Sequence, residues 1–410
     1  MIFKVIPLAI SLTIFSALSF TSVPSRAAVW ENTAEWNDAS ESQYRQWVSQ
    51  NWNKDYFNQA GPMKGSMMDC ADVVYSMRAI FASQNGLPFA MKDPTTRAGT
   101  IISNSMTRWD SKSQDQRVRS FIQLIFGVGS TASLPADTYP TAIGPMTLGA
   151  GSMIVTDKAN HHSWTIQHFS QTGIPYLLFG SRPARTLLYE RNEYPTVGFV
   201  FPQGIRAETN GGFRNFRQPA DVGKPVYDVP GYSLEQYSFP AATFMKTVQK
   251  RMQNIEETGE QHVLRVYNEA CKGSRERVEI VRGAIQKQGE IGARCMNATE
   301  YDDQSTPSRD SRLKDSFKDL AAAYKDALNN RSITAGTRKL VESVLSGASS
   351  VSNTNAACLV EISPGTKLTL GQIFAFSVGD KLSNNPHDTL QMRWGLQAGP
   401  SAKAKSCPVY

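Results

Sequence analysis

One cysteine and a pair of adjacent histidines have the side chains that thiol-based cleavage of an amide bond requires. Cys70 stands at the start of a segment with helical periodicity, and the doublet His161-His162 opens a later segment with strand periodicity. In such chemistry the thiol attacks a carbonyl carbon, and the imidazole takes the thiol proton and later returns it to the leaving amine. The two segments therefore indicate a cysteine nucleophile with a histidine base.

Cys70 lies in the first turn of a helix that we predict to end before Asn85-Gly86. Apolar residues repeat at helical spacing behind it: Val73, Val74, Met77, Ile80 and Phe81. Asp69 is the expected N-cap and Asp72 its reciprocal partner, so the thiol lies near the positive end of the helix dipole. Because two carboxylates oppose the thiolate, the sequence leaves the pKa of Cys70 undetermined. The alternative is that Cys70 packs in the core, as reduced cysteines often do.

A period of two begins after residue 151 and predicts an antiparallel meander. Its strands are expected over 152–156, 162–168 and 174–179, with a fourth over 196–201. Residues of even number on the second strand share one face, namely His162, Trp164, Ile166 and His168. Residues of odd number share the other, namely His161, Ser163, Thr165 and Gln167. We expect the more apolar, even-numbered face to pack on the Cys70 helix, which makes His162 the first candidate base and His161 the second.

The N-terminus has the pattern of an export signal. Lys4 precedes an apolar run over 5–20, and small residues follow at Ala27 and Ala28. Such a run is too short for a lasting membrane span, and the small residues match a cleavage site. We therefore expect a signal peptide over 1–27, a periplasmic or secreted mature protein, and no membrane span after cleavage.

Charge and composition restrict the partners. The formal net charge is +7 and the isoelectric point is about 9.1, which suits an anionic partner. No basic run carries interleaved aromatic residues of the kind that a nucleic-acid groove uses, so we expect no nucleic-acid partner. Adjacent strand residues point to opposite faces, and no third ligand is spaced to complete a metal site with His161 and His162. No metal or cofactor is predicted, and the oligomeric state stays open.

The chain has five cysteines, an odd number for an exported protein. Four fall in the second half, namely Cys271, Cys295, Cys358 and Cys407. The simplest partition is two disulfides plus the Cys70 thiol. Spacing does not decide the pairing, although the local choice joins Cys271 to Cys295 and Cys358 to Cys407.

The expected fold class is α+β with two domains. The first, 28–238, has the cysteine-bearing helix packed on an antiparallel sheet, with further helices over 30–57 and 110–126. The chain beyond residue 204 is polar and rich in glycine and proline, and it includes a basic-aromatic segment, 213–217, that we expect to be a loop. We place the boundary near Ser238. The second domain, 239–410, is expected to be mainly helical and to contain the disulfides, with helices over 241–255, 261–295 and 306–329.

The first domain resembles papain-like cysteine peptidases, and more closely their NlpC-type bacterial cell-wall branch. The similarity consists of the helix start Asp69-Cys70-Ala71-Asp72, the strand lead-in over 148–155 and the histidine doublet, and it covers residues 61–201. It implies that Cys70 is the nucleophile, that His162 is the general acid and base, and that a polar residue on the next strand orients the imidazole. Ser181 is the candidate for that third role, with Gln167 and Asp157 as alternatives.

The resemblance implies an exported cysteine hydrolase that cleaves an amide bond in peptidoglycan stem peptides or another peptide substrate. The oxyanion would be bound by the Cys70 backbone N–H and by a donor from the preceding loop, where Ser66 and Lys64 are the candidates. One alternative is a catalytically inactive envelope protein that uses the same fold to bind cell-wall glycan, peptide or a protein partner. Another is transfer to an amine in place of hydrolysis, which uses the same acyl-enzyme intermediate.

Overall fold

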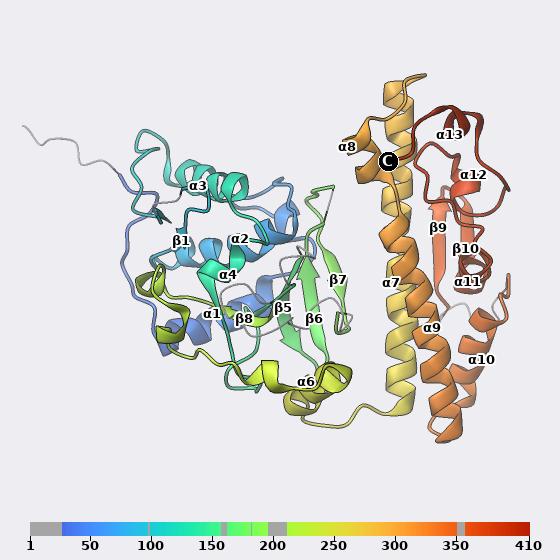
Figure 1. Ribbon diagram of the computed structural model, residues 1–410, viewed down its shortest axis with the longest axis horizontal. Helices are drawn as coiled ribbons and strands as arrows, with labels where there is room; N and C mark the ends of the chain where they lie inside the picture. The colour runs from blue at the N-terminus through green and yellow to red at the C-terminus, as the bar shows by residue number, and fades with distance from the viewer. Residues whose placement is uncertain (1–26, 97–98, 157–161, 182, 196–210, 351–356) are drawn as a thin grey trace, which may run out of the picture.

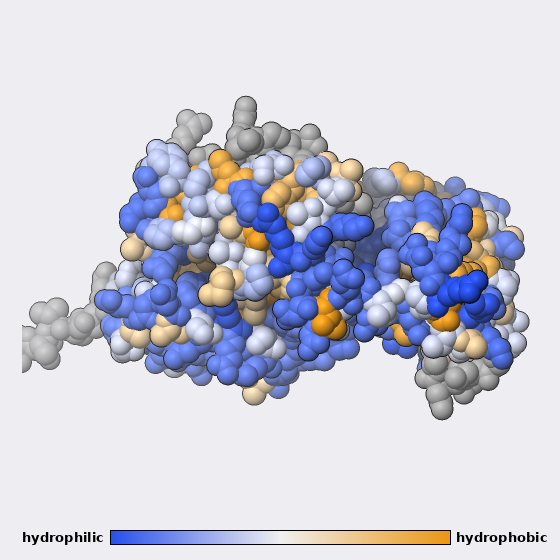
Figure 2. Space-filling view, turned by 90° about the horizontal axis from the view of Figure 1, so that it is seen from below, coloured by the Kyte–Doolittle hydropathy of each residue, from blue (hydrophilic) through white to orange (hydrophobic). Residues whose placement is uncertain are grey.

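The computed structural model shows two lobes (Figure 1). It describes residues 27–96, 99–156, 162–181, 183–195, 211–350 and 357–410. The predicted signal peptide, apart from Ala27, and the strand predicted over 196–201 lie outside these ranges. The space-filling view in Figure 2 shows a mainly hydrophilic face on which the two lobes meet at a narrower waist.

The first lobe, here called the sheet lobe, begins with helices. They are α1 (Asp38–Asn51), α2 (Cys70–Gln84), α3 (Gln114–Val128) and α4 (Leu134–Asp137), with a 3-10 turn η1 (Tyr56–Asn58) after α1. Of these helices, α1, α2 and α3 start at capping residues. The helix expected over 30–57 is the shorter α1, because the Asn37 side chain caps its start and the backbone becomes extended at Trp52. Ser113 likewise caps α3, so the helix expected over 110–126 starts later.

The centre of the lobe is a six-stranded antiparallel sheet with the strand order β3-β8-β4-β5-β6-β7. Its strands are β3 (Thr138–Pro140), β4 (Met153–Val155), β5 (Ser163–Phe169), β6 (Pro175–Phe179), β7 (Tyr189–Arg191) and β8 (Gly212–Phe216). The predicted meander β4-β5-β6 is confirmed. The loop expected over 213–217 is wrong: it lies largely in β8, where Phe213 and Arg214 are fully buried. A separate hairpin joins β1 (Ala90–Lys92) to β2 (Ile101–Ser103).

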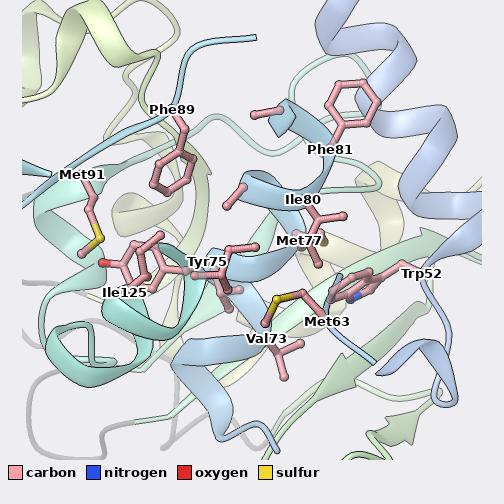
Figure 3. Close-up of a cluster of buried hydrophobic side chains, with 14 of the residues drawn as sticks. Trp52, Met63, Val73, Tyr75, Met77, Ile80, Phe81, Phe89, Met91 and Ile125 are labelled. Atoms are coloured by element: carbon pink, nitrogen blue, oxygen red, sulfur yellow. The ribbon is translucent and has the colours of Figure 1, made fainter. Parts of the chain in front are cut away.

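The two faces of the sheet carry different cores. On one face Met153, Val155 and Leu178 join the core formed with α1, α2 and α3. Figure 3 shows side chains of this core around α2, among them Trp52, Met63 and Met77. On the other face a second core contains residues of even number from β5 and of odd number from β6, together with the helix α6 (Phe244–Met252).

Short 3-10 turns lead from β8 to α6. They are η2 (Pro219–Asp221), η3 (Val226–Asp228), η4 (Glu235–Ser238) and η5 (Ala241–Thr243). Because Phe244, Val248 and Met252 pack into the second core of the sheet, α6 belongs to the sheet lobe. The two lobes therefore divide after Met252, beyond the boundary that we expected near Ser238.

The second lobe, here called the helical lobe, is built on the antiparallel pair α7 (Gly259–Ile291) and α9 (Pro307–Asn329), which confirms the two long predicted helices. The remaining elements are α8 (Ala298–Gln304), α10 (Ala335–Leu345), β9 (Leu359–Ser363), β10 (Thr366–Thr369), α11 (Leu370–Val378), α12 (Leu390–Arg393) and α13 (Ala402–Ser406). β9 and β10 form a hairpin that packs beside α7 and α11. One apolar cluster from these elements forms the core of the lobe.

Two disulfides join distant parts of the helical lobe. They are Cys271–Cys358 and Cys295–Cys407, so the partition into two disulfides plus Cys70 is confirmed and the local pairing is wrong. Cys271 lies inside α7 and Cys295 lies beyond its end, and the intervening helix holds them about 30 Å apart, far more than a disulfide spans. Such disulfides are typical of oxidising compartments. No helix within the described ranges combines the length and the apolar character needed to cross a membrane.

Candidate active site around Cys70

The cap of α2 positions Cys70 as predicted. The Asp69 side chain accepts hydrogen bonds from the backbone N–H groups of Ala71 and Asp72, at 3.0 and 3.2 Å. The Asp72 carboxylate in turn accepts the Asp69 N–H at 3.0 Å. This reciprocal capping box fixes Cys70 as the first helical residue, beside the positive end of the helix dipole.

The Cys70 thiol lies between a loop and the sheet. Its Sγ is 3.1 Å from Oγ1 of Thr131, a buried residue in the loop that follows α3. The Cys70 carbonyl accepts a hydrogen bond from Ser163 Oγ at 3.1 Å, which ties the first turn of α2 to the start of β5. Nothing in the sequence around Thr131 indicated this contact, because it depends on how two distant segments pack.

The surroundings of Cys70 favour the neutral thiol. Burial raises its pKa above the ordinary value, and the negative charge of Asp69 acts in the same direction. Hydrogen bonds from Thr131 and from the backbone oppose this rise without reversing it. The position at a helix start therefore does not produce a stable thiolate by itself, and a nucleophile here needs a base to remove its proton.

The end of β6 lies directly against the start of α2. A Cβ atom added to Gly180 would be 2.2 Å from the Asp69 carbonyl oxygen, so only glycine allows this approach. Beyond it, the Met68 N–H donates to the Arg185 carbonyl at 2.9 Å. Ser181 follows Gly180, so the predicted third residue is located beside the first turn of α2. Its hydroxyl accepts a hydrogen bond of 3.4 Å from Arg309 of α9 in the helical lobe.

His162 directly precedes β5, and its ring lies on the side of the sheet that is turned away from Cys70. Its ring packs edge-on against Trp164, at 4.4 Å between centroids, and against Phe179, at 5.4 Å. Trp164 and Phe179 belong to the second core, whereas Ser163 on the opposite face contacts Cys70. The prediction that His162 faces the thiol is therefore wrong. Burial, followed by the charges of Arg312 and Arg191, lowers the pKa of His162 to about 3.

The face of β5 that covers α2 is the more polar one. The apolar side chains that α2 needs come from β4 and β6, and the hydroxyls on this face of β5 are satisfied locally. Ser163 donates to Cys70, and Thr165 donates to the Leu178 carbonyl at 2.7 Å. His161 has the same odd-numbered parity as these residues but lies outside the described residues, as does Asp157.

The remaining predicted residues differ in whether their side chains already make a hydrogen bond to another described residue. Gln167 donates to the Trp52 carbonyl at 2.6 Å, further along β5, and so holds the loop after α1. Ser66 is buried, and its hydroxyl makes no hydrogen bond to another described residue. Lys64 is exposed, and its carbonyl accepts from Arg119. Of the two oxyanion candidates, Ser66 therefore has the environment of an unused donor.

A cleft of about 290 Å³ opens near the other end of β5 and β6. It is lined by Asn53, Lys54, Asp55, Gln167, Tyr176, Leu177, Leu178 and Glu190. Cys70 does not line it. Within the described parts of the chain, no group of three or more His, Cys, Asp or Glu side chains lies close enough together to hold a metal ion.

No protein family, curated protein or solved structure matches this chain. The functional assignment therefore depends on the site itself. The fold brings together the Cys70 thiol, the Thr131 and Ser163 hydroxyls and the end of β6 at Ser181, and it separates His162 from them.

Proposed function

We propose that this chain is an exported cysteine hydrolase that cleaves an amide bond, with Cys70 as the nucleophile and with a sheet lobe of the papain-like, NlpC-type kind. The observation that carries the proposal is the placement of the thiol at the first residue of α2, against the start of β5, the strand that the histidine doublet opens. Peptidoglycan stem peptides are the favoured substrates, because their acidic groups suit a chain with a net charge of +7.

The pairing of the five cysteines supports the proposal. Four of the five cysteines form disulfides in the helical lobe, and Cys70 is the one that keeps its thiol. A thiol in an oxidising compartment is exposed to oxidation, and its retention at a helix start is readily explained by a chemical role.

The proposal assigns the base to His161 in place of His162. His161 has the parity of Ser163, whose side chain contacts Cys70, whereas His162 packs with the second core. In the acylation step Sγ attacks the carbonyl carbon while the imidazole accepts the thiol proton. The amine then leaves with that proton, and water releases the acid from the resulting thioester. Because burial raises the pKa of Cys70, proton removal accompanies the attack.

A binding protein without catalysis is the second candidate, and two observations favour it. The pKa of the Cys70 thiol is raised, and the Ser181 hydroxyl is hydrogen-bonded to Arg309 of the other lobe. In this reading the same lobe binds cell-wall glycan, peptide or a protein partner, and Cys70 has a packing role.

Cleavage assays on single variants test the proposal. The mature protein and its Cys70→Ala, His161→Ala and His162→Ala variants are incubated with purified peptidoglycan and with synthetic stem peptides, and new amino groups are measured. We expect Cys70→Ala to abolish cleavage and His161→Ala to reduce it by about 10²- to 10⁴-fold. His162→Ala is the matched control, with a loss below about 10-fold.

Iodoacetamide labelling of the native protein, read by peptide mass spectrometry, complements the assays. Alkylation of Cys70 before unfolding, together with loss of cleavage, supports the hydrolase. If Cys70 reacts only after denaturation and the wild type cleaves no peptide, the binding protein replaces it. If His162→Ala abolishes cleavage and His161→Ala does not, the assignment of the base is incorrect.

A further inference from the structure

The loop between α3 and α4 places one hydroxyl group against the candidate nucleophile. Thr131 Oγ1 lies 3.1 Å from Cys70 Sγ, and the Thr131 residue is only 6% exposed. Within the described chain this hydroxyl has no other hydrogen-bond partner, so the sulfur is the group to which it can donate. The contact therefore joins the sulfur that would attack a carbonyl carbon to a buried donor from a distant segment.

Buried hydrogen bonds hold this loop in position. Ser133 Oγ closes the loop through two backbone hydrogen bonds of 2.9 and 2.8 Å. It also lies 3.1 Å from the hydroxyl of Tyr75, which donates to the buried Asp137 carboxylate at 2.7 Å. Tyr75 and Cys70 both belong to α2, so the helix that carries the thiol also fixes the loop that contacts it. The Thr131 hydroxyl is therefore positioned before any substrate binds.

Thr131 is the side-chain donor among the groups that favour the thiolate. Burial raises the pKa of the Cys70 thiol, whereas hydrogen bonds from Thr131 and from the backbone of Ala71 and Ser163 act in the opposite direction. The two backbone donors belong to the helix start and to β5, and a substitution leaves them in place. The contribution of Thr131 can therefore be removed by itself.

The charged groups near the thiol do not take over this role. The carboxylates of Asp69 and Asp72 belong to the capping box of α2, and the charge of Asp69 opposes the thiolate. On the sheet side, the His162 ring packs against the second core, and the Arg309 guanidinium donates to Ser181. A thiolate at Sγ therefore meets like charge from its own helix and a neutral donor from the loop.

We propose that the Thr131 hydroxyl donates a hydrogen bond to the Cys70 sulfur as negative charge develops on it, and so acts as a catalytic residue. This inference rests on the proposed hydrolase. When the base takes the proton from Sγ, the sulfur can only accept hydrogen bonds, so the Thr131 O–H points to it. A hydrogen bond to an ionised group is roughly twice as strong as one between neutral groups. The contact therefore stabilises the thiolate more than the thiol, and it makes the sulfur easier to deprotonate as Sγ attacks the carbonyl carbon.

The pH dependence of Cys70 alkylation measures this hydrogen bond. Native wild type, Thr131→Val and Thr131→Ser are treated with iodoacetamide across pH, and the ultraviolet absorbance of the thiolate, relative to the matching Cys70→Ala protein, gives the same midpoint without a reagent. We expect Thr131→Val to move the midpoint to higher pH and to lower the alkylation rate at neutral pH by about 3- to 10-fold. The loss of thiolate is partly offset, because a more basic sulfur is a better nucleophile. Thr131→Ser keeps the hydroxyl and should keep the wild-type midpoint.

Thr165→Val is the matched control. Thr165 is also a buried threonine facing α2, but its hydroxyl donates to the Leu178 carbonyl at 2.7 Å. This variant loses a buried hydroxyl of the same lobe and should keep the wild-type midpoint. Thr131→Ala removes the hydroxyl without adding an apolar group and should behave as Thr131→Val does.

Three results overturn the inference. The first is an unchanged midpoint in Thr131→Val and Thr131→Ala. The second is a midpoint at lower pH, which means that the neutral thiol donates to Thr131 and is stabilised by it. The third is an equal rise of the midpoint in Thr165→Val, which means that any buried hydroxyl facing α2 has the same effect.

Cleavage of stem peptides by the same variants separates the two proposals. If both are correct, Thr131→Val lowers the cleavage rate and Thr131→Ser restores it. A raised midpoint in Thr131→Val without any cleavage by the wild type supports the hydrogen bond from Thr131 to the thiolate and removes the hydrolase. Cleavage that requires Cys70 but is equally fast in Thr131→Val supports the hydrolase and overturns the catalytic role of Thr131.

Discussion

Arg78 in the sheet lobe and Arg277 in the helical lobe are both buried beneath a tryptophan and paired with a carboxylate. The Arg78 guanidinium lies 3.3 Å from the Trp36 centroid and forms a bidentate pair with Glu41. Arg277 lies 4.7 Å from the Trp394 centroid and is paired with Asp310. The Glu41 side chain is 32% exposed, whereas that of Asp310 is 15% exposed. The ion pair of the helical lobe is therefore less exposed to solvent than that of the sheet lobe.

The surroundings of the two pairs differ further. Arg277 has an Nη1 group without a hydrogen-bond partner in the described chain. Burial, followed by the charge of Arg277, lowers the pKa of the buried Arg393 to about 9. The helical lobe also has a single core cluster and two disulfides, whereas the sheet lobe has a core on each face of its sheet and no disulfide. Covalent links therefore accompany the lobe with the smaller core and the more crowded charges. The lobe with the thiol is stabilised by packing.

Removal of one disulfide should produce the largest effect. Cys271 and Cys358 are separated by 87 residues, and closing such a loop is worth about 4–5 kcal/mol. In the Cys271→Ala/Cys358→Ala double variant we expect the helical lobe to melt at lower temperature while the sheet lobe keeps its transition. Differential scanning calorimetry measures both, with Cys70→Ala as control. A shift of both transitions by the same amount would contradict the view that the lobes are stabilised separately.

Removal of the carboxylate from either arginine pair should have the next largest effect on stability. Asp310→Ala should destabilise the helical lobe by about 3–5 kcal/mol, because it leaves the buried Arg277 charge without its carboxylate. Glu41→Ala should cost about 1–3 kcal/mol, because Glu41 is the more exposed member of its pair and water can take the place of its carboxylate. Urea unfolding of each variant gives the values. Equal losses of unfolding free energy in the two variants would show that the difference in burial between the two ion pairs does not affect their contribution to stability.

Asp137 should give the sheet lobe a third effect, similar in size to that of Glu41→Ala and visible as a dependence on pH. It is buried, accepts hydrogen bonds from the Tyr75 hydroxyl and the Lys92 N–H, and has a pKa raised by burial to about 6. Because its folded pKa exceeds its unfolded value of about 3.9, its contribution to stability is present at low pH and is lost as pH rises through about 4 to 6. The loss amounts to about 2–3 kcal/mol.

Asp137→Asn removes this titration and leaves the others in place. The difference in unfolding free energy between wild type and variant should therefore change by about 2–3 kcal/mol in favour of the variant between pH 4 and pH 7. Urea unfolding at both pH values measures it. A difference that does not vary with pH would mean that Asp137 titrates normally.

The sequence by itself determined the local features of this protein. The cap and apolar stripe of α2, the long helix α9, the β4-β5-β6 meander and the partition of five cysteines follow from short-range hydrogen bonding, periodicity and count. The position of Cys70 in the first turn of α2 was accessible in this way. The pairs that form between distant segments were not, as the strands β3, β7 and β8 and both disulfides demonstrate.

Only the tertiary structure decided which face of β5 covers α2. A period of two defines two faces but does not say which neighbour each one meets, and the greater apolar content of the His162 face suggested the wrong choice. Met153, Val155 and Leu178 from the flanking strands already fill the space behind α2, so the hydroxyls of Ser163 and Thr165 can face it with local partners. His162 then packs on the opposite face of the sheet against Trp164 and Phe179, where side chains of several strands share one core.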